Sequence, residues 1–302
     1  MFGEFRNAFD RYNNGHVQLI IINVVIFLVM AILFVTSRWF GFEPVFTFVE
    51  KIFVLPPKFG DFVTRAWTII TYAFAHDWTD VLHILFNMLA LYWFGGLLIE
   101  YLGNDKLIAV YVLGALAGGV LYLLMFNLVP YFQSRSDFDG LVGASAAVFA
   151  VMMAIVTLIP DYTFFLLFLG PVKIKYIALF YIVVSFIGSV GGNAGGNIAH
   201  LGGLLIGYVY TKQLQAGVNW GGWVTATITW VSGLFKSSPK VKVTYRKSEP
   251  TTASSSRKAT AKQGFNKATQ EEIDAILDKI SDKGYESLTK EEKEKLFNAS
   301  KK

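Results

Sequence analysis

Six apolar stretches alternate with polar segments along this chain, and each is about as long as a helix that crosses a bilayer. Such a helix needs roughly 20 apolar residues, within a range of about 17 to 25. The six stretches cover residues 17–37, 80–101, 106–128, 143–160, 174–190 and 197–213. The apolar segment 162–170, between the fourth and fifth, predicts a connecting strand or loop. The pattern therefore predicts an all-α, polytopic membrane protein with a bundle of six transmembrane helices, spanning 17–213.

The segments outside these helices differ sharply in character. Residues 1–16 are polar and predict a cytosolic N-terminus, whereas the long first loop, 38–79, is rich in aromatic residues that favour the outer membrane interface. The segment 214–235 predicts an amphipathic helix lying at the membrane surface. Its apolar face is formed by Trp220, Trp223, Val224, Val231 and Leu234.

The C-terminal part is polar and falls into two pieces. Residues 236–268 are rich in Lys, Ser and Thr, which predicts a basic disordered linker close to anionic lipid headgroups. Residues 269–302 predict two short cytosolic helices, each starting with a capping box: Thr269 with Glu272, and Thr289 with Glu292. This small tail is expected to form a helical hairpin or to await a cytosolic partner.

Composition excludes several kinds of chemistry. The 302 residues are 54% hydrophobic and 16% charged, against roughly 25% charged residues in an average soluble domain. The absence of cysteine excludes disulfides, thiolate catalysis and cysteine-ligated zinc. The four histidines show no metal-ligand spacing. We therefore expect no cofactor, no metal and no nucleic-acid partner. The net charge of +5 comes largely from the tail and says little about the membrane-embedded body.

Basic residues near the helix ends predict the orientation. They favour the side that contains both termini, so both termini are expected to be cytoplasmic. The first apolar run is too long for a cleavable signal core, which fits a multi-pass protein of a bacterial inner membrane. In this topology the second, fourth and sixth helices all enter from the outer face.

This topology predicts that four polar side chains lie at the same depth in the membrane. His83 and Asn87 lie in the first turns of the second helix, Ser145 starts the fourth, and His200 lies at the start of the sixth. Polar groups in membrane helices mark functional sites by default. A serine hydroxyl becomes an effective nucleophile when a neighbouring base takes its proton, so Ser145 and His200 predict a catalytic dyad. His83 and Asn87 would donate hydrogen bonds to the oxyanion, alongside the backbone N–H of Ser145.

Small residues predict how these helices approach each other. Gly203 and Gly207 form a Gly-x-x-x-Gly surface on the sixth helix, and such a surface favours close helix contact. Contact with the fourth helix would bring His200 within hydrogen-bond distance of Ser145. Phe149, four residues after Ser145, is placed to support the imidazole.

The same residues resemble a known family. His83-Ile84-Leu85-Phe86-Asn87, Gly143-x-Ser145 and Ala199-His200-x-x-Gly203-x-x-x-Gly207 occur in the order typical of the rhomboid intramembrane serine proteases. The resemblance covers about residues 15–213 and looks bacterial in type, with a C-terminal cytosolic extension.

This resemblance implies that Ser145 is the nucleophile and His200 the general base. It also implies a substrate, the transmembrane segment of another membrane protein, cut near the outer face through an acyl-enzyme. Two positions depart from the family pattern. Ala146 stands where the family often has glycine, and Arg65-Ala66-Trp67 only partly matches the Trp-Arg element of the first loop.

Two other functions compete with proteolysis. A non-catalytic rhomboid-like protein would bind membrane clients, but such a relative is expected to lack the serine or the histidine. A channel or transporter would show repeats or interrupted helices with sites near the bilayer midplane. The sequence favours the protease over both.

Overall fold

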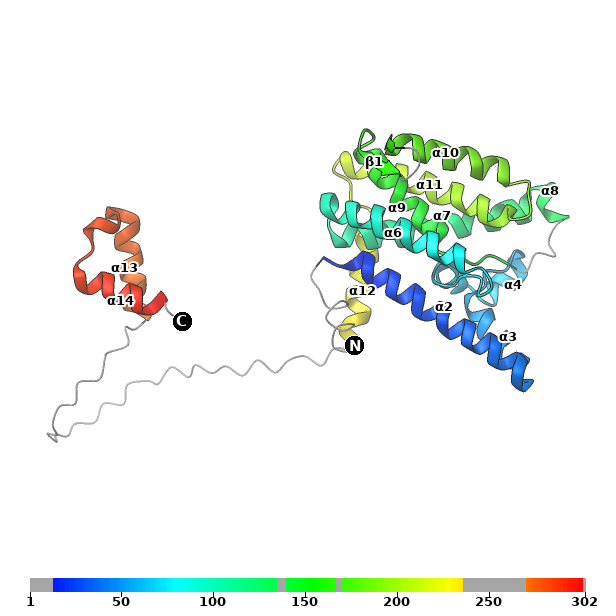
Figure 1. The fold of residues 1–302 in the computed structure, drawn as a ribbon, viewed down its shortest axis with the longest axis horizontal. Coiled ribbons are helices and arrows are strands. Elements are labelled where there is room, and N and C mark those ends of the chain that lie inside the picture. The colour runs from blue at the N-terminus through cyan, green and yellow to red at the C-terminus, as the bar shows by residue number, and fades with distance from the viewer. Residues whose placement is uncertain (1–12, 135–139, 167–169, 236–269, 301–302) are drawn as a thin grey trace. The chain divides into compact units, whose positions relative to one another are not determined.

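The computed structural model describes residues 13–134, 140–166, 170–235 and 270–300. The chain divides into two compact units, Met1–Pro239 and Lys240–Lys302 (Figure 1). The first unit contains α2 (Gly15–Phe40), α3 (Glu43–Phe53), α4 (Phe59–Val63), α5 (Thr68–Thr71), η1 (Tyr72–Phe74), α6 (Val81–Leu102), α7 (Asn104–Leu128), α8 (Pro130–Gln133), α9 (Ser145–Leu158), β1 (Thr163–Leu166), β2 (Gly170–Lys173), α10 (Ile174–Gly188), α11 (Ala194–Gln215) and α12 (Gly222–Phe235). The second contains α13 (Gln270–Lys283), η2 (Tyr285–Ser287) and α14 (Lys290–Ser300).

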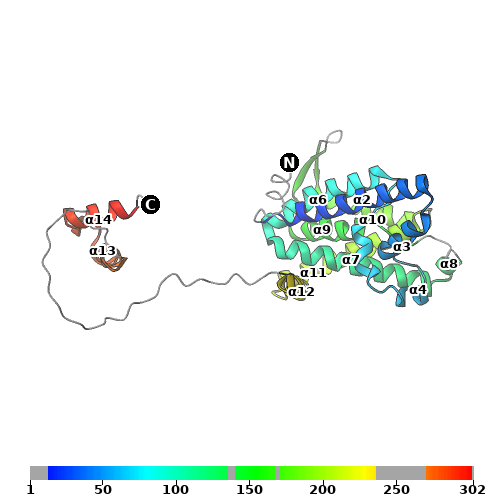
Figure 2. The same cartoon turned by 90° about the horizontal axis from the view of Figure 1, so that it is seen from below.

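The six expected helices are present as α2, α6, α7, α9, α10 and α11, so the all-α membrane bundle is confirmed. Among the described residues α2, α6 and α7 are long and apolar enough to span a membrane by themselves, whereas α9 and α10 are apolar but shorter. In the bundle α7, α9 and α11 pack against one another, α6 packs on α9, and α2 lies along α6 (Figure 2). Helix α10 packs mainly on α11, and its outer face is exposed.

Helix α9 is the centre of the bundle. Its 14 residues span only about 21 Å, less than the hydrocarbon thickness of about 30 Å. Ten of these residues are buried, because α6, α7 and α11 surround the helix. A short helix enclosed in this way has an end inside the domain, and that end carries Ser145.

Close helix contact depends on residues without side chains. A Cβ at Gly203 would collide with the Ala146 carbonyl oxygen, and one at Gly207 would collide with the Ala150 carbonyl oxygen. On the α7 side, a Cβ at Gly118 would lie 2.6 Å from the Ala146 Cβ. The Gly-x-x-x-Gly surface therefore packs against α9, as the sequence predicts.

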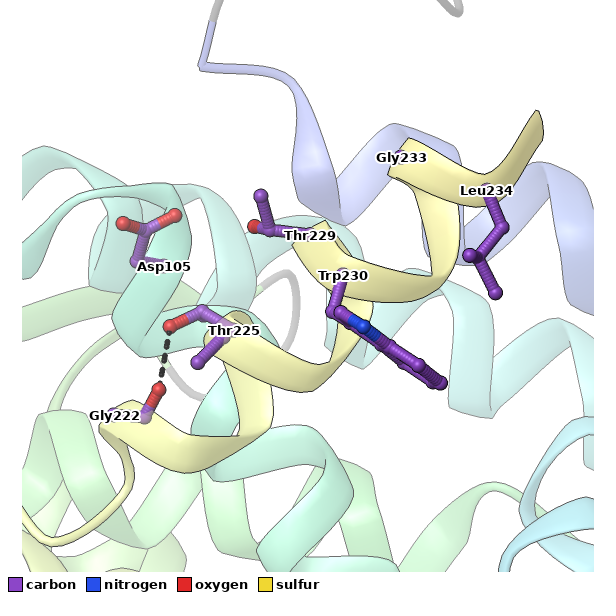
Figure 3. Close-up of a pocket in the computed structure, with 8 residues that line it drawn as sticks. Asp105, Gly222, Thr225, Thr229, Trp230, Gly233 and Leu234 are labelled. Atoms are coloured by element: carbon purple, nitrogen blue, oxygen red, sulfur yellow. Dashed lines mark hydrogen bonds between the residues drawn. The ribbon is translucent and has the colours of Figure 1, made fainter. Parts of the chain in front are cut away.

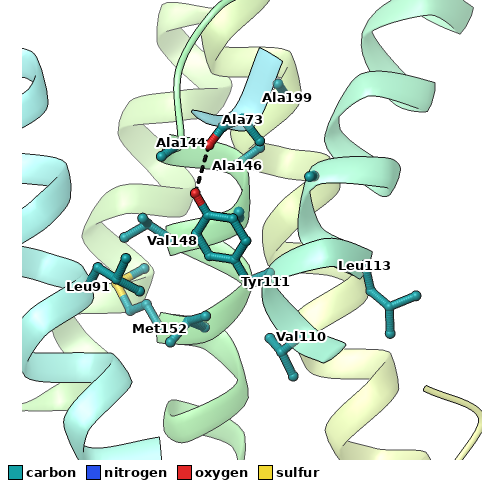
Figure 4. Packing of buried hydrophobic residues seen from close by; sticks show 14 of the residues in the cluster. Ala73, Leu91, Val110, Tyr111, Leu113, Ala144, Ala146, Val148, Met152 and Ala199 are labelled. Carbon is teal, nitrogen blue, oxygen red and sulfur yellow. Dashed lines mark hydrogen bonds between the residues drawn. The ribbon is translucent and has the colours of Figure 1, made fainter. Parts of the chain in front are cut away.

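The first loop contains more structure than the sequence predicts. Residues 38–79 begin inside α2 and then form α3, α4, α5 and η1. Buried tyrosines tie this segment to α7: the Tyr72 hydroxyl donates to the Ala115 carbonyl at 2.8 Å, and the Tyr111 hydroxyl donates to the Ala73 carbonyl at 2.7 Å (Figure 4). Their phenolic groups are satisfied by backbone carbonyls, so the segment is anchored in the core and does not lie only on the interface.

The connection between α9 and α10 is a β-hairpin. Its strands β1 and β2 pair antiparallel, with Thr163 opposite Lys173 and Leu166 opposite Gly170. At its base Lys173 and Lys175 donate to the Asp161 carboxylate at 3.0 and 2.8 Å. The expectation of a strand or loop at 162–170 was correct for β1 but missed its partner strand.

Helix α12 lies beside the start of α7, and the predicted surface helix is shorter than expected. Residues 214–221 belong to the end of α11 and a turn, and Trp220 lies before α12 with its ring against Tyr210. Val224 is buried, whereas Trp230 and Leu234 are exposed beside a hollow of about 730 Å³ near Asp105 (Figure 3). The predicted apolar face is therefore only partly correct.

The second unit is a helical hairpin, one of the two expected arrangements. Gly284, with φ of 78°, ends α13, and Ile276 and Leu288 are buried. The second capping box is present: Thr289 Oγ1 accepts from the Glu292 N–H at 3.2 Å, and the Glu292 carboxylate accepts from the Thr289 N–H at 2.7 Å. The first box and the predicted basic linker lie outside the described residues, because they include or precede residue 269.

We expect Gly203→Ala to destabilise the membrane unit, because the new Cβ meets a backbone carbonyl that cannot rotate away. Overpacking of this kind costs about 1–3 kcal/mol. Thermal unfolding in detergent should show a lower Tm than in the unchanged protein. Gly192→Ala is the matched control, since a Cβ at Gly192 has nothing within 4 Å. Equal Tm values for the two variants would contradict the close contact of α9 and α11.

Candidate active site

Ser145 is the first residue of α9, and a strand-like segment leads into it. That segment is held by backbone hydrogen bonds. Leu141 exchanges two with Leu55, at 3.0 and 2.9 Å, and the Gly143 N–H donates to the Tyr72 carbonyl at 3.0 Å. The first loop therefore fixes the position of the serine, whose side chain is buried.

Gly143 allows the chain to turn into the helix. Its φ of 134° is a conformation that residues with a Cβ rarely adopt. A Cβ there would also lie 3.3 Å from His83 Cε1 and 3.6 Å from Ser145 Oγ. The backbone conformation therefore favours glycine here, and a side chain would in addition press on His83.

His200 lies in the second turn of α11, opposite Ser145. Its Nε2 is 2.8 Å from Ser145 Oγ, so the hydrogen-bond contact predicted from the glycine surface is present. Phe149 supports the imidazole as expected: the two rings are stacked, with centroids 4.3 Å apart and planes 13° apart. Tyr181 of α10 contacts Phe149 edge-on at 5.0 Å.

The other imidazole nitrogen has a partner that sequence reasoning missed. Ser185 Oγ of α10 lies 3.3 Å from His200 Nδ1. Ser185 is 1% exposed and lies in the last turn of α10, within an otherwise apolar run. A buried hydroxyl in such a run needs a hydrogen-bond partner, and this was the signal available in the sequence. In the described part of the chain, no carboxylate forms a hydrogen bond with the His200 ring.

His83 and Asn87 lie on one face of α6 and line the same cavity as Ser145 and His200. Asp80 caps this helix, since its carboxylate accepts from the His83 N–H at 3.0 Å. The Asn87 amide donates one hydrogen bond to the His83 carbonyl at 3.0 Å, which fixes its orientation. The Ser145 N–H, in the first turn of α9, has no partner within its own helix and lies at the positive end of the helix dipole.

The cavity holds about 490 Å³ and changes in character along its length. Around Ser145 it is polar. Away from the serine it continues between α6, α9 and α10, where Phe86, Phe94, Met152 and Tyr181 make its wall apolar. The four polar groups therefore stand at one end of an apolar groove.

Ala146, where a glycine was expected, fits because its neighbours are small. It is fully buried, and its Cβ faces Gly118 of α7 while its carbonyl faces Gly203 of α11. The methyl group therefore occupies space that Gly118 leaves open, and Ser145 keeps its contact with His200.

His76 links the first loop to the serine segment. It is 1% exposed, its Nε2 accepts from the Ala144 N–H at 3.5 Å, and its ring meets His83 edge-on at 5.4 Å. Burial and the nearby His83 lower the pKa of His76 from 6.5 to about 3. A neutral imidazole is thus required to hold the backbone beside Ser145.

Acid should therefore destabilise the fold through His76. The His76 imidazole takes up a proton near pH 6.5 in the unfolded chain but only near pH 3 in the folded chain. The contribution of His76 to the free energy of unfolding is therefore complete above pH 6.5 and is lost as the pH falls from 6.5 to 3. In His76→Gln the amide oxygen can accept the same N–H and does not titrate. Between pH 7 and pH 4, the Tm of this variant should fall by less than the Tm of the unchanged protein. Parallel Tm curves would contradict the role of His76.

Comparison with known protein families matches residues 63–216 to the Rhomboid domain and residues 265–302 to a family of unknown function, DUF6576. The first match contains Ser145, His200, His83 and Asn87, together with the glycines that pack around them.

Individual proteins similar to this chain are also named as rhomboid proteins. RHOMBOID-like protein 12, mitochondrial, of Arabidopsis thaliana is 34% identical over 51% of this chain and 48% of its own length. Rhomboid protein 1, mitochondrial, of Saccharomyces cerevisiae is 32% identical over 63% and 54%. Rhomboid protease GlpG of Haemophilus influenzae is 26% identical over 62% and 87%. The chain thus spans about half the length of the first two relatives. With a matched domain that covers half of its residues, the chain belongs to the rhomboid family.

Proposed function

We propose that this protein is an intramembrane serine endopeptidase that cuts transmembrane segments of other membrane proteins. The observation that supports this most directly is the 2.8 Å contact between Ser145 Oγ and His200 Nε2 at the polar end of an apolar groove. A nucleophile, a base and a place for an apolar peptide are then present together. Membership of a family that includes a named protease supports the same reaction.

The reaction begins when Ser145 Oγ attacks the carbonyl carbon of the scissile peptide bond. His200 Nε2 takes the hydroxyl proton and later gives it to the amine that leaves. The product is an acyl-enzyme, an ester between Ser145 and the N-terminal part of the substrate. A water molecule, deprotonated by the same imidazole, attacks this ester and releases Ser145.

Negative charge on the carbonyl oxygen is stabilised by donors around Ser145. These are the Ser145 N–H, the His83 ring and the Asn87 amide, all at the same end of the cavity. One such donor contributes about 2.7–4 kcal/mol of transition-state stabilisation. The arrangement of α6 and α9 holds these donors in place before substrate arrives.

Substrate enters sideways from the bilayer, between α6 and α10. The apolar part of the cavity is lined by side chains of both helices, including Phe86 and Tyr181. Helix α10 packs mainly on one neighbour and presents apolar residues such as Phe180 and Ile187 outward. It is therefore the helix that separates from the bundle most easily.

The tail and the location complete the proposal. We propose that both termini are cytoplasmic, that the membrane is a bacterial inner membrane, and that the basic residues 236–268 bind anionic lipid. The helical hairpin that follows would bind a cytosolic partner.

Cleavage of a transmembrane substrate in detergent tests the dyad. The unchanged protein should yield product, and Ser145→Ala and His200→Ala should each lower kcat by at least about a thousandfold, because the two groups act as a unit. Equal Tm values would show that the variants are folded. If the folded, unchanged protein yields no product from several substrates, the rhomboid fold acts instead by binding membrane clients.

Ser185→Ala tests the orientation of His200. Loss of the hydroxyl removes one neutral hydrogen bond, worth about 0.5–1.5 kcal/mol, so kcat should fall roughly twofold to tenfold while KM stays unchanged. Ser185→Thr keeps a hydroxyl and should recover part of the rate. Ser189→Ala is the matched control, because the Ser189 hydroxyl bonds only the Phe186 carbonyl. A kcat equal to that of the control would rule out a positioning role for Ser185.

A further inference from the structure

A second cavity adjoins the apolar groove at Ser145. It holds about 220 Å³ and shares Asp80, His83, Ser145 and Asn193 with the apolar groove. A water molecule occupies about 30 Å³ in the liquid, so this volume suits one extended side chain or a few waters. Because both cavities meet at Ser145, a peptide bond placed on the serine has neighbouring residues that face each of them.

This second cavity is acidic. Asp77 and Asp80 line it, both are exposed, and both carboxylates interact electrostatically with the His83 ring. Lys51 and Arg65 line a neighbouring hollow that shares Asp77, and the ion pairs among the described residues include none between these two side chains and Asp77. Within the described residues, no Lys or Arg lines the acidic cavity itself.

A buried hydroxyl in the cavity wall also lacks a partner. Tyr122 of α7 lines this cavity, is 1% exposed, and its hydroxyl has no hydrogen bond among the described residues. An unsatisfied buried polar group costs about 1–3 kcal/mol. Its presence in the wall of the same cavity as two carboxylates points to a polar group that comes from outside the chain.

We propose that the acidic cavity binds a basic side chain, Lys or Arg, that flanks the scissile bond of the substrate. The cation lies between the Asp77 and Asp80 carboxylates, and the Tyr122 hydroxyl hydrogen-bonds the polar end of the same side chain. The apolar stem passes Ser145, as long basic side chains bury their stems and leave the charge in a polar region. This inference rests on the proposed protease function.

Such a cavity would select among membrane proteins. Basic residues are depleted near the outer ends of transmembrane segments, since the positive-inside rule places them on the cytoplasmic side. A segment with Lys or Arg at its outer end is therefore uncommon. Recognition of that charge distinguishes a few clients from the many segments whose apolar residues would fit the groove.

The test uses the full-length protein and one cleavable transmembrane substrate. Lys, Gln or Glu is placed in turn at each position next to the scissile bond, and kcat/KM is measured for each. At one position the Lys substrate should exceed the Gln substrate by about tenfold, as expected for a hydrogen bond to a charged group, and Glu should be poorest. Asp77→Asn and Asp80→Asn should each lower the Lys-to-Gln ratio by about threefold.

Both variants keep the fold. Asn at 80 still caps α6, and Asn at 77 keeps the side-chain oxygen that accepts from Thr79. Asp61→Asn is the control, because it removes an exposed charge from the same loop but lines neither cavity. Its Lys-to-Gln ratio should equal that of the unchanged protein.

The outcomes separate the two proposals. Equal kcat/KM for Lys, Gln and Glu at every position, with product formed, would overturn the basic subsite and leave the protease intact. A uniform fall for all three substrates in the Asp variants, without a change of ratio, would show that Asp77 and Asp80 do not recognise the basic side chain and would also overturn the subsite. No product from any substrate would overturn the proposed function itself.

Discussion

The contact between α9 and α11 is the constraint on which the rest of the structure depends. It brings backbone against backbone at Gly203 and Gly207, so that neither position has room for a Cβ. In a bilayer, where lipid tails are as apolar as side chains, such contact supplies dispersion energy that burial alone does not. The close approach of these helices also sets the distance between Ser145 and His200, so the contact that packs the bundle also forms the candidate dyad.

Much of this arrangement follows from the order of apolar and polar residues. Six apolar runs predict the helices, and the alternating direction of successive helices predicts that His83, Asn87, Ser145 and His200 lie at one level. These four line one cavity in the structure. The prediction succeeded because a membrane restricts helices to two directions, so depth can be read from sequence once direction is assigned.

Other parts depend on contacts between segments far apart in the chain, which periodicity does not reveal. The first loop folds into short helices because Tyr72 and Tyr111 find carbonyl partners across it. Ser185 meets His200 because α10 turns one particular face inward, and its apolar run gives no preferred face. Asp77 and Asp80 suggest a binding site only together with Tyr122, whose unpaired hydroxyl belongs to the wall of the same cavity.

The length of α10 has a consequence for the surrounding lipid. Its 15 residues span about 22 Å, and most of its apolar side chains face outward, whereas a bilayer core is about 30 Å thick. Hydrophobic mismatch of this size must be met by local thinning of the bilayer or by aromatic residues such as Tyr176 at the helix ends. The mismatch between α10 and the bilayer thus depends on the length of the lipid chains. The lipid composition of the membrane therefore contributes to the free energy of moving α10 away from the groove.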